Sequence, residues 1–160
     1  MDDFIFKWRF KEDKYDNLPK NHLEQIKPLD SEGAKFIDNF INANDLHSDA
    51  PFKKGFFKTI DKAKVFENNN QQIKKWLYNR AIPFDQDIYL SWAQDTAVKT
   101  KWKMLVKYWD SFYYGGSDDL TVFPASLEWS LLFYHEDEIY FGTNKNYKVK
   151  QEYSEELFIW

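Results

Sequence analysis

The hydrophobic side chains in the first part of the chain change their spacing several times, and each spacing predicts a different element. Phenylalanine and tryptophan occupy every second position of residues 4–10, which is the period of a half-buried strand. Residues 11–29 are polar and contain Pro19 and Pro28, so we expect an irregular connection with room for one short helical turn. Residues 45–69 keep no period, and the sequence assigns them no element.

Two amphipathic helices are predicted in the N-terminal half. The first begins after a cap at Asp30 or Ser31 and ends near residues 42–44. Its apolar stripe consists of Ile37, Phe40 and Ile41. The second helix covers residues 71–80 and must end before Pro83, because a proline drives the residue before it out of the helical region.

A strand and a longer helix are predicted next. Apolar and polar side chains alternate over residues 88–92, and Asp95 or Thr96 then stands where a helix cap belongs. The glycine pair at residues 115–116 is expected to end this helix. Its single apolar stripe consists of Val98, Trp102, Leu105, Trp109 and Phe112. We expect the two tryptophans of the stripe to be buried in the core.

Three short extended runs follow the glycine pair, at residues 120–123, 127–134 and 138–142. The turns between them, at residues 124–126 and 135–137, are too short for a parallel crossover, so the three strands must pair antiparallel. The sequence therefore predicts an α+β fold, with an antiparallel sheet packed against an amphipathic helix and further helices in the N-terminal half.

Length and composition narrow the class of protein. A chain of 160 residues without low-complexity segments predicts one globular domain over residues 1–160. The absence of cysteine excludes disulfides, thiolate zinc sites and iron–sulfur clusters. The start of the chain lacks the apolar run of a secretory signal, and apolar stretches such as residues 131–134 are far too short to span a bilayer. We therefore expect a soluble, cytoplasmic protein that does not enter a membrane.

Negative charge is concentrated in one part of the chain. Residues 1–107 contain 19 Lys/Arg and 16 Asp/Glu, whereas residues 108–144 contain 7 Asp/Glu and no Lys or Arg. The same segment is rich in aromatic side chains. A surface that combines carboxylates with aromatic rings suits a basic protein partner and repels nucleic acid.

Two parts of this acidic segment, residues 110–119 and residues 135–138, are candidate binding sites. The candidate partner-binding residues are Asp110, Tyr113, Tyr114, Ser117, Asp118, Asp119, His135 and Glu136. Adjacent carboxylates in an extended strand point to opposite faces, so Asp118 and Asp119 are not expected to share an ion. The alternative interpretation is that both parts are ordinary turns, since glycine, serine and aspartate favour such places.

Motifs for catalysis are missing from the sequence. No second histidine stands at position 139 to complete a His-Glu-x-x-His zinc motif, and the glycine pair does not end in the Gly-Lys-Ser/Thr of a phosphate loop. No serine has the flanking glycines of a nucleophile elbow. We therefore assign no catalytic residue, metal ligand or cofactor.

The stretch from Trp109 through the glycine pair to Pro124, followed by Trp129, by His135 and Glu136 and by residues 140–142, resembles small bacterial proteins of uncharacterised families. Several of these families are similar to immunity proteins of toxin–immunity systems. The resemblance covers residues 82–144 and implies a protein that binds and neutralises a toxin domain.

Three functional hypotheses follow. The first is a non-enzymatic binding module, an immunity protein that masks a basic nuclease-type toxin domain with its acidic aromatic surface. The second is a metal-dependent hydrolase that uses Asp118, Asp119, His135 and Glu136. The third is a small-ligand or carbohydrate binder with an aromatic platform. Separately, the apolar residues Leu157–Trp160 suggest a homodimer contact or docking on the body of the protein.

Overall fold

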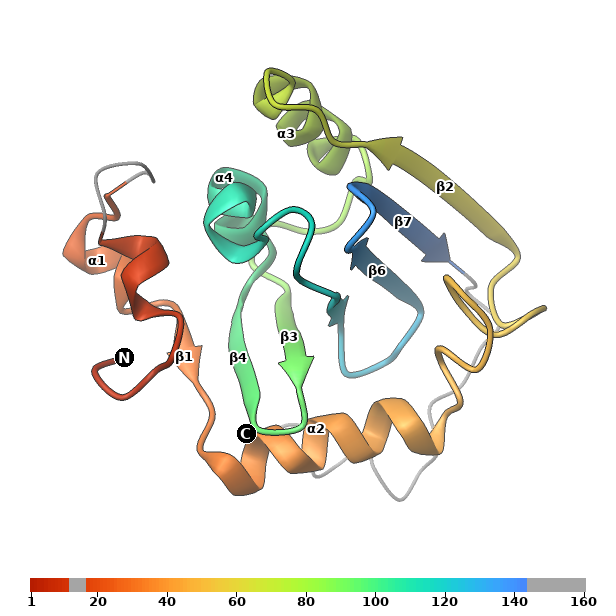
Figure 1. Ribbon diagram of the computed structural model, residues 1–160, viewed down its shortest axis with the longest axis horizontal. Helices are drawn as coiled ribbons and strands as arrows, with labels where there is room; N and C mark the ends of the chain where they lie inside the picture. The colour runs from red at the N-terminus through yellow and green to blue at the C-terminus, as the bar shows by residue number, and fades with distance from the viewer. Residues whose placement is uncertain (12–16, 144–160) are drawn as a thin grey trace.

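In the described part of the chain, seven strands form one antiparallel sheet with the order β1-β4-β3-β5-β6-β7-β2 (Figure 1). The computed structural model describes residues 1–11 and 17–143. The residues 157–160, which we expected to form a dimer contact, lie outside the described residues. Together with the four α-helices found among the described residues, the sheet confirms the predicted α+β fold.

The seven strands are β1 (Lys27–Pro28), β2 (Thr59–Lys64), β3 (Asp87–Ala93), β4 (Thr96–Lys101), β5 (Leu120–Phe123), β6 (Trp129–Tyr134) and β7 (Glu138–Thr143). The helices are the short 3₁₀-helix η1 (Lys7–Phe10) and the α-helices α1 (Lys20–Leu23), α2 (Ser31–Ala43), α3 (Asn70–Tyr78) and α4 (Trp102–Phe112).

Both faces of the sheet are covered by helices, α2 on one face and α3 and α4 on the other (Figure 1). Neighbouring residues of one strand point to opposite faces, so Tyr89 belongs to the core under α2 whereas Leu90 belongs to the core under α4. In β5, Phe123 and Val122 divide between the two cores in the same way. The central strands are therefore buried on both sides.

Helix α2 forms where its pattern predicted it. The carboxylate of Asp30 accepts a hydrogen bond of 2.8 Å from the amide of Gly33 and so caps the first turn. Its stripe of Ile37, Phe40 and Ile41 is buried against the sheet. Helix α3 also confirms its prediction to within two residues at each end.

The helix predicted from residue 96 is wrong in its first part. Residues 96–101 form β4, which pairs with β3 on one side and with β1 on the other, and α4 begins only at Trp102. Val98 and Trp102 still share one core, because a spacing of four residues returns to the same face in a strand and in a helix. Hydrogen bonds to β3 on one side and to β1 on the other pair the backbone groups of β4, and this pairing favours the strand over the helix.

The strand predicted at residues 4–10 is also wrong, since this segment contains a turn and η1. Phe4 and Phe10 are buried as the alternation suggested, but Arg9 is buried as well. Strand β2 lies in the unassigned segment 45–69 at the edge of the sheet, and its side chains are almost all exposed. It therefore lacks the alternating pattern that a half-buried strand would have.

The three strands at the end of the described chain confirm their prediction. β5, β6 and β7 pair antiparallel through the two predicted turns. Across residues 1–11 and 17–143 there is no helix with the length and hydrophobicity needed to cross a membrane.

Candidate functional site

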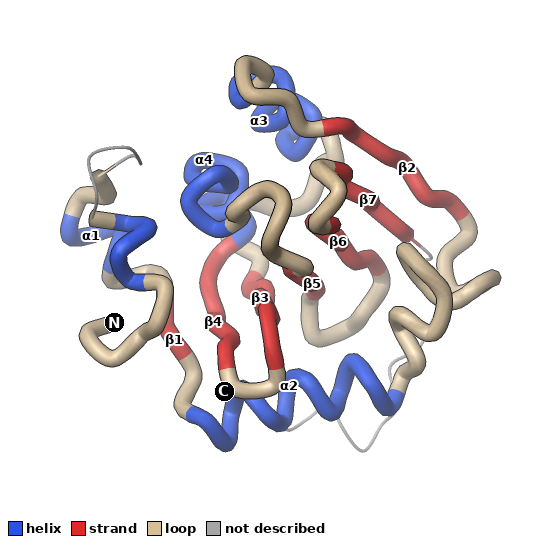
Figure 2. Tube along the Cα trace, viewed as in Figure 1, coloured by secondary structure: helices blue, strands red, loops and turns tan. Residues whose placement is uncertain are grey.

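The two candidate segments predicted from the sequence meet in space. The loop of residues 113–119 leaves α4, and the turn of residues 135–137 joins β6 to β7, so both lie at the end of the strands nearest α4 (Figure 2). The carboxylate of Asp119 accepts hydrogen bonds from the amide and from Nδ1 of His135, at 3.0 and 2.9 Å. These two segments are called the acidic loop pair below.

A buried ion pair fixes the base of the acidic loop pair. The guanidinium of Arg9 donates two hydrogen bonds to the carboxylate of Asp118, at 2.5 and 3.2 Å. The same carboxylate accepts a hydrogen bond of 2.8 Å from the amide of Tyr114 and so closes the loop. We expected Asp118 at the surface, and this is wrong, since its side chain is only 9% exposed.

The two neighbouring aspartates thus have different surroundings. Asp118 points inward to Arg9 of η1, near the start of the chain, whereas Asp119 is exposed and faces His135. This divergence agrees with the expectation that the two side chains cannot hold one ion. The carboxylate of Asp119 forms an ion pair with His135 when the imidazole is protonated.

The glycine at position 115 allows the loop to approach the turn. A Cβ atom at this position would lie 2.7 Å from the carboxylate of Asp137, too close for any other residue without a shift of that side chain. Gly116 has a φ of +81°, a backbone conformation that glycine adopts readily. The glycine pair therefore shapes the acidic loop pair, whereas α4 has already ended at Phe112.

The remaining predicted residues divide into buried and exposed ones. The hydroxyl of Tyr113 donates a hydrogen bond of 2.5 Å to the carbonyl of Tyr134, and burial raises the pKa of this phenol. Asp110 is half-buried and accepts a hydrogen bond of 2.7 Å from the side chain of Asn70 in α3. Tyr113 and Asp110 therefore make structural contacts within the protein instead of facing a partner.

The predicted site residues whose side chains are exposed are Tyr114, Ser117, Asp119, His135 and Glu136. The ring of Tyr114 is 43% exposed and packs edge-on against Trp8, with the centroids 6.3 Å apart. Asp137 was not among the residues predicted from the sequence, although it is the third residue of the predicted turn and is half-exposed.

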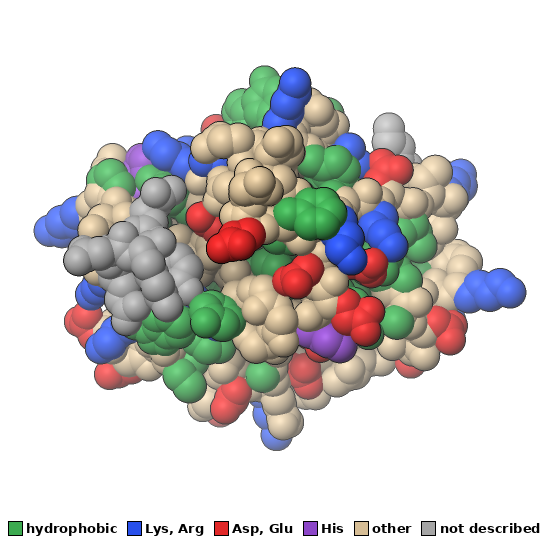
Figure 3. All heavy atoms as spheres, turned by 45° about the horizontal axis from the view of Figure 1, so that its top comes forward, with side chains coloured by type: hydrophobic (Ala, Val, Ile, Leu, Met, Phe, Trp, Pro, Cys, Tyr) green, Lys and Arg blue, Asp and Glu red, His purple; other side chains and the backbone are tan. Residues whose placement is uncertain are grey.

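Lysines of β2 limit the acidic surface on one side. Lys62 lies 3.0 Å from the carboxylate of Glu138, and hydrogen bonds from Tyr140 and from Lys62 lower the pKa of Glu138. Burial, together with the hydrogen bond to Glu138, raises the pKa of Tyr140 to about 12. Figure 3 shows acidic side chains and a histidine gathered near the middle of one face, with positively charged side chains beside them. The carboxylates of the acidic loop pair that are exposed or half-exposed and that Lys62 does not contact are those of Asp119, Glu136 and Asp137.

The donor set does not resemble a metal site. Within the part of the chain that the structure describes, no three His, Cys, Asp or Glu side chains converge in a way that could hold a metal ion. His135 contacts one carboxylate, that of Asp119. What the acidic loop pair offers is an exposed set of carboxylates beside an aromatic ring, which suits binding by charge and burial.

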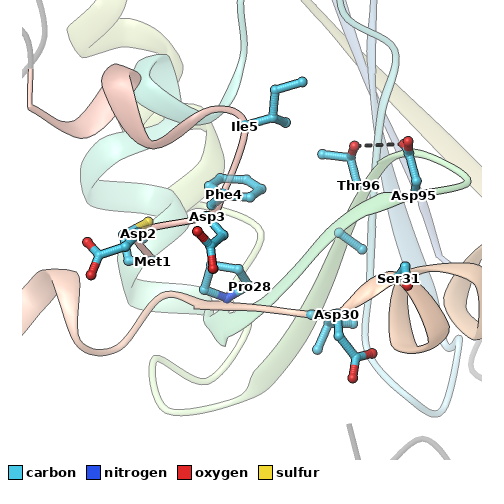
Figure 4. Close-up of a pocket in the computed structure, with 12 residues that line it drawn as sticks. Met1, Asp2, Asp3, Phe4, Ile5, Pro28, Asp30, Ser31, Asp95 and Thr96 are labelled. Carbon is cyan, nitrogen blue, oxygen red and sulfur yellow. Dashed lines mark hydrogen bonds between the residues drawn. The ribbon is translucent and has the colours of Figure 1, made fainter.

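A separate hollow of about 650 Å³ lies between the first residues of the chain, the segment leading into α2 and the turn between β3 and β4 (Figure 4). Asp2, Asp3, Asp30 and Asp95 are among the residues that line it. The carboxylate of Asp30 caps α2, and the carboxylate of Asp95 accepts a hydrogen bond of 2.9 Å from the hydroxyl of Thr96. None of the residues of the acidic loop pair lines this hollow.

Comparison with known proteins gives a family and no function. Neither the curated proteins nor the solved structures compared with this chain include a match. The model of the family described as "Protein of unknown function (DUF2947)" matches residues 1–142, a range that contains the whole acidic loop pair and Arg9. Since this match covers most of the chain, the protein belongs to the DUF2947 family.

Proposed function

We propose that this protein is a non-enzymatic binding module that docks its acidic loop pair on a basic protein. The observation that carries the proposal is that two acidic loops meet, because Asp119 is hydrogen-bonded to His135 and Gly115 approaches Asp137 closely. The exposed Glu136 belongs to the same turn as His135, and the exposed Tyr114 belongs to the same loop as Asp119. The partner we propose is a nuclease-type toxin domain, which the protein neutralises as an immunity protein.

The charges suit such a partner for a physical reason. A nuclease domain needs a positively charged surface to hold the phosphates of its substrate. Carboxylates placed on that surface attract it from a distance, so they raise the rate of association, while an aromatic ring buried at the contact slows dissociation. Occupying the basic surface also excludes the nucleic acid.

The buried base of the acidic loop pair supports binding by keeping the loops in place. Arg9 and Asp118 connect η1 to the loop, and the hydroxyl of Tyr113 connects the loop to the last residue of β6. A surface that is already ordered loses less conformational entropy when a partner binds.

The test is charge reversal at the exposed carboxylates. The variant Asp119→Lys with Glu136→Lys is compared with Glu67→Lys with Glu128→Lys, which changes the net charge equally at exposed sites outside the acidic loop pair. Each protein is used as bait in a lysate of the source organism, and binding kinetics and nuclease activity are measured on the protein retained.

We expect the first variant to lower the association rate by roughly tenfold or more, with a steep salt dependence in the unmodified protein, and the second variant to change it little. Tyr114→Ala should act mainly on the dissociation rate. If both charge-reversed baits retain the same partner with equal affinity, or if the retained protein keeps its nuclease activity when bound, the proposal is wrong.

A further inference from the structure

A second charged surface, of opposite sign, lies between α3 and α4, which are neighbours on one face of the sheet (Figure 1). It forms an open groove of about 410 Å³, called the basic groove here. Its lining residues are Gln71, Lys74, Lys75, Tyr78, Phe84, Lys103, Val106 and Lys107. None of them belongs to the acidic loop pair.

Lysines stand on both walls of the basic groove. Lys74 and Lys75 come from α3, and Lys103 and Lys107 come from α4. None of the lining residues is acidic. One of the four ammonium groups, that of Lys103, lies 3.0 Å from the exposed carboxylate of Asp85 just outside the groove. The groove therefore carries a positive charge although the whole chain has a formal net charge of −4.

Apolar side chains line the same groove as these lysines. The rings of Tyr78 and Phe84 are 57% and 51% exposed, and their centroids are 5.7 Å apart. Val106 is buried at the same place. Large aromatic rings exposed as a pair and bordered by charge are typical of a surface that another molecule covers.

We propose that the basic groove binds an acidic amphipathic helix of a partner protein. A helix laid between α3 and α4 places its apolar stripe on the exposed rings of Tyr78 and Phe84, as a third helix packs against two others. Carboxylates on both flanks of that stripe then meet the lysines of both walls. A single strand of nucleic acid fits this arrangement less well, because its phosphates run along one edge and its bases along the other.

The inference is independent of the proposed function. The acidic loop pair selects a basic surface, whereas the basic groove selects an acidic one, and the two share no residue. Mutations in one are therefore expected to leave binding at the other intact.

The experiment uses the full chain and three fluorescein-labelled probes. The first is a synthetic peptide whose helical pattern puts leucine and phenylalanine on one stripe and glutamate on both flanks. The second is a scrambled peptide of the same composition, which keeps the charge and loses the stripe. The third is oligothymidylate of equal charge. Fluorescence anisotropy measures each affinity with the wild type and with the variants.

Two variants of equal charge separate the groove from the surface in general. Lys75→Glu with Lys107→Glu changes exposed residues of the groove, and Lys35→Glu with Lys54→Glu changes exposed lysines elsewhere. We expect the groove variant to weaken binding of the patterned peptide by roughly tenfold and the control variant by no more than about twofold. Tyr78→Ala should weaken binding by roughly fivefold or more without changing its salt dependence. Far-ultraviolet circular dichroism confirms that each variant is folded.

Four outcomes would overturn the inference: no binding of the patterned peptide to the wild type, equal binding of the scrambled peptide, tighter binding of oligothymidylate, or equal effects of the two lysine variants. Preference for oligothymidylate would instead identify the groove as a nucleic-acid site.

Discussion

The ion pair between Arg9 and Asp118 should be the most sensitive polar contact in the molecule. Its two side chains are 5% and 9% exposed, and the pair joins η1 to the loop after α4. Replacing Asp118 with asparagine keeps the shape of the side chain and leaves it able to accept a hydrogen bond from the amide of Tyr114. What the change removes is the negative charge, so the guanidinium of Arg9 stays buried without a counter-charge.

The expected loss of stability follows from that burial. Removing one partner of a buried ion pair costs about 3–5 kcal/mol, because the remaining charge is held away from water. The guanidinium also donates a hydrogen bond of 3.4 Å to the carbonyl of Phe112, which is too weak to replace a carboxylate. For a chain of this length, such a loss corresponds to a decrease of roughly 10 °C in the melting temperature.

Urea unfolding followed by tryptophan fluorescence measures this loss. The control is Asp119→Asn, which changes the neighbouring, exposed carboxylate and should cost only about 0–1 kcal/mol. Adding Arg9→Met to Asp118→Asn should restore part of the stability, since it removes the buried charge. A loss below about 1 kcal/mol for Asp118→Asn, or equal losses for the two asparagine variants, would refute the reasoning.

Three further predictions concern the core and its response to pH. Trp102→Ala should lower the free energy of unfolding by about 3–5 kcal/mol in urea titrations, because the ring is 0% exposed and packs 5.3 Å from Trp129; a loss under about 1 kcal/mol would contradict its place in the core. Burial lowers the pKa of His47 below 6.5, so the unfolded chain takes up a proton before the folded protein does, and stability should fall as pH drops below 6.5. Unfolding titrations at several pH values should show a smaller fall for His47→Gln, and an unchanged fall would contradict this origin. Gly142→Ala should cost about 1–3 kcal/mol, since the new methyl group would stand 2.7 Å from Cγ of Phe57, and Phe57→Leu in the same chain should recover part of that cost.

The fold was predictable where one local pattern allows only one element. Strands β5 to β7 are separated by turns too short for anything but antiparallel pairing, and α2 has a cap and a stripe that agree. Residues 96–101 were not predictable in this way, because Val98 and Trp102 are four residues apart, a spacing that suits a strand and a helix equally. The partner strands β1 and β3, which come from elsewhere in the chain, decide between the two.

Edge and terminal segments were missed for a related reason. Strand β2 has no buried face of its own, so its pairing with β7 leaves no mark in its hydrophobic pattern. Residues 4–10 carry the alternation of a strand, but their aromatic rings and Arg9 reach the core from a turn and η1 instead.

For the candidate site, the sequence by itself determined that acidic and aromatic side chains gather in residues 108–144 and that two of its turns are rich in carboxylates. Only the tertiary structure decided which carboxylates face a partner. Asp118 turns inward because a cation from η1 lies beneath it, and Asp119 turns outward to His135 of the neighbouring turn. The basic groove likewise exists only because α3 and α4 pack together and bring their lysines to one place. Local patterns determine which face of a helix or strand is buried. Which charged side chains come to lie next to one another depends on segments that are distant in the sequence and that folding brings together.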